Sequence, residues 1–174
     1  MGQPGQTFHI GQGELAVSAD EGAMLTAVLG SCVAACIWDP DRGVGGMNHI
    51  LLPEGKDNDM RRKLYGTNAM ELLINRLLQN GAERRNLRAK LFGGARMIAG
   101  LSDIGARNSQ FVREFCQREE ISVAAMSLGG TDARRIQFWP RSGKVRQRVM
   151  TEAPVRVVAP TPKIPAPASD VELF

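Results

Sequence analysis

The chain has 174 residues, 43% of them hydrophobic and 23% charged, which is typical of one globular domain that needs neither disulfides nor a structural metal. Its three cysteines do not indicate a disulfide framework. Since it has neither a secretory signal nor the ~18 apolar residues of a membrane span, we expect a cytoplasmic protein without membrane insertion. The net charge of +4 suggests nucleic-acid binding, but few aromatic residues lie among the basic ones and no binding motif is present. A solvated face, or one that meets an acidic protein partner, is therefore favoured over a nucleic-acid surface.

Short apolar or alternating runs predict strands along most of the chain. Turn sequences at 39–43 and 140–143 join neighbouring runs as hairpins. We therefore expect an α+β fold with antiparallel or mixed sheets. The predicted strands cover residues 7–17, 24–29, 33–38, 44–52, 87–92, 121–127, 135–139 and 144–150.

Two helices are predicted between the strands. Apolar residues repeat at helical spacing from Met70 to Leu78, with Asn68 as the expected N-cap and Gly81 at the end. A second, less regular pattern predicts a helix over residues 108–119.

The C-terminal segment differs in composition from the rest of the chain. Residues 152–174 carry five of the nine prolines and little periodic pattern. Because proline removes backbone donors, such a segment supplies few ladder hydrogen bonds. The sequence therefore predicts one domain, residues 1–151, and a flexible tail, residues 152–174, whose last residues are frayed.

A cysteine and a histidine lie on neighbouring predicted strands. Cys32 in LTAVLGSCVAACIWD and His49 in VGGMNHILLP are separated by the turn at 39–43, so antiparallel pairing brings them close. A thiol with a pKa near ~8.5 needs such a partner to act as a nucleophile. The Gly30-Ser31 pair before Cys32 allows a sharp turn whose amides, those of Ser31 and Cys32, can stabilise an oxyanion. Thr26, placed on the same strand and face by period-two counting, has a hydroxyl that can orient the imidazole.

Spacing alone leaves other interpretations open for these residues. Cys32, Cys36 and Cys116 are also compatible with small core side chains. Cys32, Cys36 and His49 do not have zinc-site spacing, and the two cysteines lack the helix N-terminus of a redox CxxC motif. The Gly-Gly pairs do not form a phosphate loop and indicate turns or close backbone approach.

Several sequence blocks occur together in a fixed order. LTAVLGSCVAACIWDP contains T-x5-C, and GGMNHILLP follows it with His49 seventeen residues after Cys32. KLFGGARM, IGARN and ISVAAMSLGGTDARRIQFWPRSGKV come next. Over roughly residues 20–150, this arrangement resembles the CheD family, the chemoreceptor glutamine deamidases of bacterial chemotaxis.

The resemblance implies a layered α/β/β/α cysteine hydrolase, related to toxin deamidases, that uses no metal or organic cofactor. Cys32 matches the family's nucleophile, His49 its base and Thr26 its orienting residue. The implied substrates are glutamine side chains on the cytoplasmic helices of chemoreceptors, and the implied second partner is a CheC-type phosphatase. The alternative is a binding module that tethers or activates such a phosphatase with little catalysis of its own.

Two features lie outside the expected catalytic residues. The family pattern has an acidic residue before a Gly-Gly pair, where this chain has Ser127, and Ala133 replaces a common glycine. Both departures bear on substrate docking or partner choice more than on the chemistry. The basic residues near the end of the domain, including Arg146 and Arg148, are expected to dock an acidic receptor surface.

Overall fold

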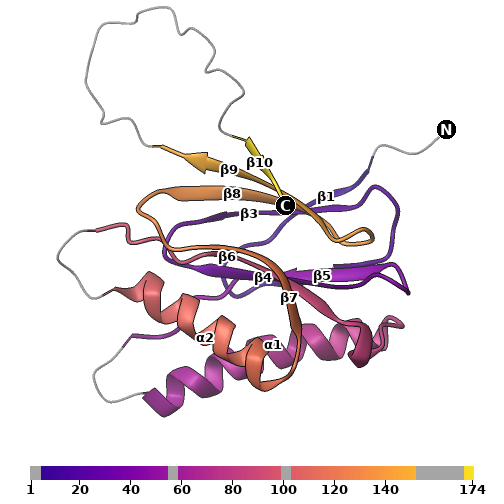
Figure 1. Ribbon diagram of the computed structural model, residues 1–174, viewed down its shortest axis with the longest axis horizontal. Coiled ribbons are helices and arrows are strands. Elements are labelled where there is room, and N and C mark those ends of the chain that lie inside the picture. Colours follow the sequence, from indigo (N-terminus) through magenta and orange to yellow (C-terminus); the bar gives the residue numbers. More distant parts are fainter. Residues whose placement is uncertain (1–4, 55–58, 99–102, 152–170) are drawn as a thin grey trace, which may run out of the picture.

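Two five-stranded sheets lie face to face in the computed structural model, which describes residues 5–54, 59–98, 103–151 and 171–174 (Figure 1). We call them sheet A, with the order β1-β3-β8-β9-β10, and sheet B, with the order β2-β5-β4-β6-β7. The strands of sheet A are β1 (Thr7–His9), β3 (Met24–Leu29), β8 (Ala133–Trp139), β9 (Lys144–Met150) and β10 (Val171–Leu173). Those of sheet B are β2 (Leu15–Ser18), β5 (Val44–Asn48), β4 (Val33–Asp39), β6 (Arg88–Gly93) and β7 (Ser122–Leu128).

Strand directions in the two sheets are mixed. β1 pairs with β3 and β6 with β7 in parallel, while the other pairs of named strands are antiparallel. The predicted hairpins are the pairs β4–β5 and β8–β9. The α+β class with mixed, mostly antiparallel sheets is therefore confirmed.

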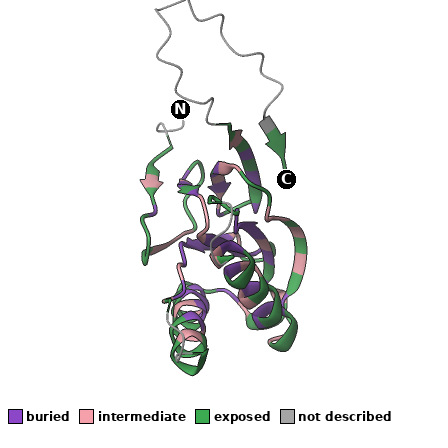
Figure 2. Cartoon of the chain, turned by 90° about the vertical axis from the view of Figure 1, so that its left-hand side faces the viewer, coloured by how far each residue is buried: buried purple, intermediate pink, exposed green. Residues whose placement is uncertain are grey.

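Both long helices cover sheet B on the face away from sheet A. α1 (Asp59–Gln79) contacts β2, β4 and β5, and α2 (Ile104–Arg118) contacts β4, β6 and β7 (Figure 1). A short 3-10 helix, η1 (Arg84–Asn86), precedes β6. Figure 2 shows that the outward faces of the helices carry the exposed residues.

The described residues form three layers, β/β/α, so the prediction of a fourth, helical layer on sheet A is wrong for this part of the chain. The outer face of sheet A explains the difference. Arg135 lies directly opposite Arg148, and Gln137 lies opposite Arg146. A helix buries an apolar stripe, and this charged face offers none for it to cover.

Several predicted boundaries differ from the structure: α2 begins four residues before its predicted start and β5 ends four residues before its predicted end. Two other differences have a clear physical cause. The single strand expected over residues 7–17 is two strands in different sheets, because the chain turns at Gly13, whose φ is 81°. The first helix begins at Asp59, so Asn68 lies inside it and is not the N-cap. Its first turns expose apolar residues such as Met60 and Leu64, and an exposed segment has no buried stripe to produce a pattern.

The apolar core has two parts, one on each face of sheet B. The helix-side cluster lies between sheet B and the helices, and it includes Val33, Ile50, Leu73 and Phe115. The other part fills the space between the two sheets, and we call it the inter-sheet cluster. Its buried members are Ile10, Leu25, Ala27, Leu29, Ala34, Cys36, Trp38, Met47, Phe92, Ile136, Phe138 and Val145.

The end of the chain is paired with sheet A. β10 runs antiparallel to β9, and Phe174 exchanges two main-chain hydrogen bonds with Val145, of 2.7 and 2.9 Å. This differs from the frayed end expected from the sequence, because a β-strand edge accepts any extended segment whatever its composition. The rest of the predicted tail, residues 152–170, lies outside the described residues.

Candidate active site

The hairpin of β4 and β5 places Cys32 and His49 on two adjacent antiparallel segments. The antiparallel pairing extends past the end of β5 to Ile50, which exchanges main-chain hydrogen bonds of 3.0 and 2.8 Å with Val33, the first residue of β4. Cys32 precedes Val33 and His49 precedes Ile50, so the two are diagonal neighbours, a relation in which Cα atoms lie ~7–8 Å apart and long side chains meet. The antiparallel pairing of these two strands, predicted from the turn at 39–43, is confirmed.

Cys32 and His49 point toward sheet A. Val33 and Ile50 belong to the helix-side cluster, and neighbouring strand residues point to opposite faces. Cys32 packs against the inter-sheet cluster and is partly buried, whereas His49 is only 8% exposed. The site therefore combines a partly accessible thiol with a buried imidazole.

The turn between β1 and β2 surrounds His49. The main-chain N–H of His49 donates to the carbonyl of Glu14 at 3.1 Å, and its carbonyl accepts from Gly13 at 2.9 Å. The ring nitrogen Nδ1 lies 2.9 Å from the carbonyl oxygen of Ile10. Because a carbonyl only accepts, Nδ1 carries the proton, and in the neutral ring Nε2 is the free base.

Thr26 is connected to the imidazole of His49 through the main chain of Ile10. It sits on β3 in sheet A, whereas Cys32 lies just before β4 in sheet B, so the same-strand placement inferred from period-two counting is wrong. Its hydroxyl donates to the carbonyl of Ile136 at 2.7 Å. Its own carbonyl accepts from the N–H of Ile10 at 2.8 Å, and Ile10 in turn holds His49.

The peptide segment that carries Cys32 is fixed by three donors. The carbonyl of Gly30 accepts from Ala95 at 2.9 Å, and that of Cys32 accepts from Gly94 at 2.8 Å. The carbonyl of Ser31 accepts from the side chain of Asn108 at 2.7 Å. With three successive carbonyls bound, the orientation of the intervening peptide planes, and so of the Ser31 and Cys32 amides, is set by the surrounding structure.

Asn108 connects the two halves of the site. This α2 side chain is fully buried, and its Oδ1 accepts from the N–H of Leu52 at 3.2 Å while its Nδ2 donates to Ser31. Leu52 comes three residues after His49, and Ser31 directly precedes Cys32. One amide group therefore fixes the segments of both candidate catalytic residues.

The Gly93-Gly94 pair lets the backbone approach Cys32. Gly93 has a φ of 107°, and a Cβ there would lie 2.2 Å from the carbonyl oxygen of Cys32. This confirms the close backbone approach predicted for this pair.

Gly93→Ala is expected to lower the free energy of unfolding by about 3 kcal/mol or more, because the added Cβ meets rigid backbone. Gly81→Ala is the matched control, since Gly81 has a φ of 100° but no atom within 4 Å of the added Cβ. It should cost only about 1 kcal/mol. Urea unfolding of both variants checks this, and equal losses would contradict the close approach.

Comparisons with known proteins extend over nearly the whole chain. The family description "CheD chemotactic sensory transduction" matches residues 51–149. A Caulobacter vibrioides (strain NA1000 / CB15N) protein named "Probable chemoreceptor glutamine deamidase CheD" is 53% identical over 174 residues, which cover 95% of this chain and 92% of that protein. The chain belongs to the CheD family. An Agrobacterium fabrum protein of the same name is 46% identical over 95% of each chain.

Among solved structures, the hypothetical protein YfiH of Bacillus licheniformis matches this CheD-family chain with a TM-score of 0.43. The sequences are 12% identical, and the match covers 65% of this chain and 49% of that one.

The three cysteines of this CheD-family chain differ in environment. Cys36 and Cys116 are fully buried, and burial raises the pKa of Cys116 to about 11 and raises that of Cys36 as well. Burial also raises the pKa of Cys32, although its own main-chain N–H acts in the opposite direction. Cys32 is therefore a protonated thiol at neutral pH that needs a base.

Iodoacetamide is expected to alkylate Cys32 in the folded protein while Cys36 and Cys116 stay unmodified. Because the pKa of Cys32 is raised, its alkylation rate should keep increasing with pH above ~8.5, the ordinary value for a free thiol. Peptide mass mapping after timed alkylation at several pH values measures this. Equal labelling of all three thiols, or a rate that levels off near pH 7, would contradict the described environment.

Small hollows adjoin the residues of the site. One of about 110 Å³ adjoins Ser31 and is lined by residues 95–98 and by the start of α2 at Asp103, Ile104 and Gly105. Another of about 120 Å³ adjoins His49 and reaches Tyr65 and Leu72 of α1. The first has exposed apolar side chains, Met97 and Ile98, at its rim.

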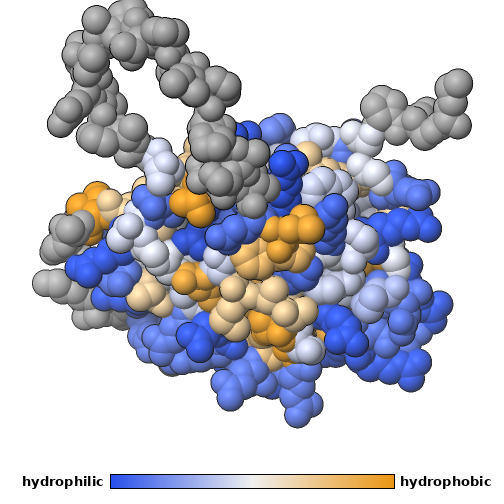
Figure 3. Space-filling model, turned by 45° about the horizontal axis from the view of Figure 1, so that its top comes forward, coloured by the Kyte–Doolittle hydropathy of each residue, from blue (hydrophilic) through white to orange (hydrophobic). Residues whose placement is uncertain are grey.

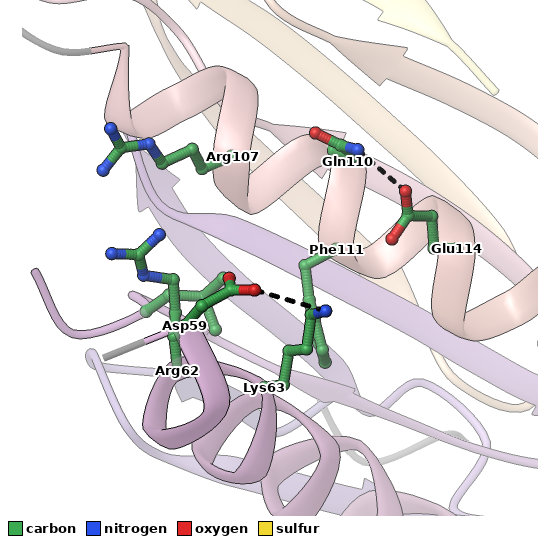
Figure 4. Close-up of a pocket in the computed structure, with 8 residues that line it drawn as sticks. Asp59, Arg62, Lys63, Arg107, Gln110, Phe111 and Glu114 are labelled. Atoms are coloured by element: carbon green, nitrogen blue, oxygen red, sulfur yellow. Dashed lines mark hydrogen bonds and ion pairs between the residues drawn. The ribbon is translucent and has the colours of Figure 1, made fainter. Parts of the chain in front are cut away.

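A larger hollow lies away from these residues, between α1 and α2. Figure 4 shows its charged lining, in which Lys63 pairs with Asp59 at 3.3 Å and Gln110 donates to Glu114 at 2.8 Å. It has a volume of about 260 Å³. Because it lies on the helix side of sheet B, it is separate from the thiol and the imidazole.

The described residues hold neither a cluster of three or more His, Cys, Asp or Glu side chains suited to a metal ion nor a helix long and apolar enough to cross a membrane.

The expected docking residues and the departures from the family pattern lie near β9. Arg146 and Arg148 are exposed on the outer face of sheet A, and neither forms an ion pair within the described chain. Ser127 accepts hydrogen bonds from the buried Arg134 through its hydroxyl and its carbonyl. Ala133 lies opposite Met150 at the end of β8.

Proposed function

We propose that this chain is a chemoreceptor glutamine deamidase, an amidohydrolase that converts glutamine side chains on the cytoplasmic helices of chemoreceptors to glutamate. The main support is the diagonal placement of Cys32 and His49 on adjacent segments, in a chain that is 53% identical to a protein named as a probable enzyme of this kind. The two residues occupy one face of one hairpin, with the ring held by Ile10.

Acylation begins with proton transfer from Cys32. Because burial raises the pKa of this thiol, Nε2 of His49 takes the proton as the sulfur attacks the side-chain carbonyl carbon of the substrate glutamine. The amides of Ser31 and Cys32 stabilise the oxyanion of the tetrahedral intermediate. The imidazolium then protonates the amide nitrogen, the C–N bond breaks, and ammonia leaves a glutamyl thioester.

Deacylation reverses the roles with water. Nε2 removes a proton from a water molecule that attacks the thioester carbonyl, and the C–S bond breaks as the sulfur regains a proton from the imidazolium. Glutamate is released and the free thiol is restored. The steps balance with water in and ammonia out, and they use no metal or organic cofactor.

Thr26 supports the ring indirectly in this proposal. Its carbonyl holds the Ile10 peptide, whose carbonyl holds Nδ1 of His49. These acceptors are uncharged, so they stabilise the imidazolium less than an aspartate would. Such an arrangement suits an enzyme that modifies each site once more than a fast metabolic enzyme.

The test is a deamidation assay on a purified receptor cytoplasmic fragment from the same organism. Mass spectrometry is expected to find specific glutamines converted to glutamate by the wild-type chain. Receptor glutamines that all remain unchanged would contradict the proposal and favour the alternative, a module that tethers or activates a CheC-type phosphatase.

We also propose that Arg146 and Arg148 dock the receptor. Arg148 lies opposite Arg135, which lies opposite Val28, two residues before Gly30, so these charges sit toward the Cys32 end of sheet A. Like charges placed directly opposite on a sheet destabilise it unless an anion compensates. Figure 3 shows this side of the molecule, where hydrophilic and hydrophobic residues are intermixed.

Replacing Arg146 and Arg148 with glutamate is expected to raise KM for the receptor fragment about tenfold at low salt with little change in kcat, because rim charges act on encounter and binding. Lys144→Glu is the control, since Lys144 lies at the opposite end of β9 beside Trp139. Unchanged kinetics in the double variant at low salt would exclude this docking face.

A further inference from the structure

The outer edge of β9 is occupied by the last residues of the chain. β10 adds a short antiparallel strand there, with Leu173 opposite Arg146 and Glu172 opposite Gln147. Main-chain hydrogen bonds between Phe174 and Val145 run in both directions. Strand addition of this kind supplies affinity through the backbone and leaves specificity to alternate side chains, which here are those of Glu172 and Phe174.

Glu172 interacts with two buried polar side chains, Gln147 and Arg134, each of which keeps one atom without a hydrogen-bond partner. The amide of Gln147 donates to its carboxylate at 3.3 Å, while Oε1 of the buried Gln147 has no hydrogen-bond partner. Arg134 is 6% exposed; its terminal nitrogens donate to Ser127 and Gly129, whereas its Nε has no hydrogen-bond partner. Burial lowers the pKa of Arg134, and the charge of Glu172 opposes that effect. This end of the sheet therefore favours an acidic side chain.

Phe174 supplies the apolar contact. Its ring meets Phe92 edge to face, with ring centroids 5.4 Å apart and planes inclined by 77°, and it packs against the inter-sheet cluster. Such an aromatic pair contributes about 1 kcal/mol beyond the area it buries. Leu173, between the two anchors, is 67% exposed. Side-chain contacts with the domain are thus made by alternate residues of the segment, Glu172 and Phe174.

We propose that the edge of β9, together with Phe92, Gln147 and Arg134, is a peptide-binding site for an extended strand of the form acidic residue, any residue, aromatic residue, and that the C-terminal segment of this chain is its resident, displaceable ligand. The attachment is short: β10 has three residues and pairs along one edge, and Phe174, the residue after it, contributes one aromatic ring. The domain core does not include it, since the buried members of the inter-sheet cluster come from elsewhere. The proposed peptide site contains neither Cys32 nor His49, although Phe92 lies opposite Ala34, two residues beyond Cys32. Peptide binding is measured without any deamidation, so the two proposals can fail separately.

The binding test uses full-length chains and a fluorescent peptide with the sequence of residues 169–174, SDVELF. Phe174→Ala weakens the resident strand, so this variant is expected to bind the peptide at least tenfold more tightly than the wild type does. Leu173→Ala, which changes an exposed side chain of the same strand, should behave like the wild type. Peptides carrying alanine in place of Glu172 or Phe174 should lose at least tenfold in affinity, and one with alanine in place of Leu173 should not.

Amide hydrogen exchange tests displacement, first in the wild-type chain and then in Phe174→Ala with added peptide. The N–H of Val145 is protected by Phe174, whereas that of the next residue, Arg146, points toward β8 by strand alternation. If β10 detaches while the domain stays folded, Val145 exchanges at least tenfold faster than Arg146 and slows on adding SDVELF peptide to Phe174→Ala. Equal exchange rates of the two amides would overturn the proposal. So would a peptide affinity that stays unchanged when alanine replaces Glu172 or Phe174 in the peptide.

Discussion

Cys32→Ala and His49→Asn are each expected to abolish receptor deamidation. Removing the sulfur eliminates the nucleophile, and losses of about 10⁴-fold or more follow when such a group is deleted. Asparagine at position 49 can still donate to the Ile10 carbonyl but has no basic nitrogen in place of Nε2. The rate should fall by about 10²–10⁴-fold, the usual contribution of a general base. Mass spectrometry of the receptor fragment measures both losses.

Cys36→Ala provides the matched control for the thiol. Cys36 is on the same strand face, four residues further along, but it is fully buried. Its loss should leave the deamidation rate within about twofold while lowering the free energy of unfolding by about 1–2 kcal/mol. Normal conversion by Cys32→Ala, or loss of activity in Cys36→Ala but not in Cys32→Ala, would refute the assignment of the nucleophile.

The pairing of Cys32 with His49 was predictable because a hairpin with a known turn leaves few registers. The turn at 39–43 fixes which residues of the two strands lie opposite, and the apolar alternation then fixes the faces. The connection from β1 to β2 was not predictable in this way. Its residues continue one alternating pattern, and only pairing with different sheets divides them into β1 and β2.

The first turns of α1 show another limit of the sequence. The predicted helix starts where the buried stripe starts, near Met70, but the structure extends it back to Asp59 through exposed residues. The spacing of apolar residues indicates which face of a helix is buried, so it gives no signal for a helical turn that is exposed on all sides. The helical layer expected on sheet A also had no apolar pattern behind it, because it was implied by the resemblance alone.

The groups that hold the catalytic residues carry weaker signals still. Ile10 acts through its carbonyl, which every residue possesses, so no side chain marks it. Asn108 lies in the block IGARN, but a buried asparagine has no readable role until its partners are known. Such groups depend on the tertiary structure, because their partners come from segments distant in the sequence.

Asn108→Asp is expected to lower kcat about a hundredfold at pH 8 and to recover toward the wild-type value as the pH falls. The carboxylate can still accept from Leu52, but it places negative charge where Nδ2 donates to the carbonyl of Ser31. Burial raises the pKa of a carboxyl above ~3.9, and the protonated form can again donate to Ser31. The ratio of variant to wild-type kcat should therefore rise as pH decreases through that raised pKa.

Asn108→Leu separates this effect from simple destabilisation. Leucine has a similar size but leaves the Ser31 carbonyl and the Leu52 N–H unpaired, so the free energy of unfolding should fall by about 2–4 kcal/mol. The kcat should also fall, and it should not recover at low pH. Ser109→Ala is the neighbouring control, because the buried hydroxyl of Ser109 has no hydrogen-bond partner and its loss should be nearly neutral. A pH-independent ratio for Asn108→Asp would show that the donor to Ser31 is not what positions Cys32.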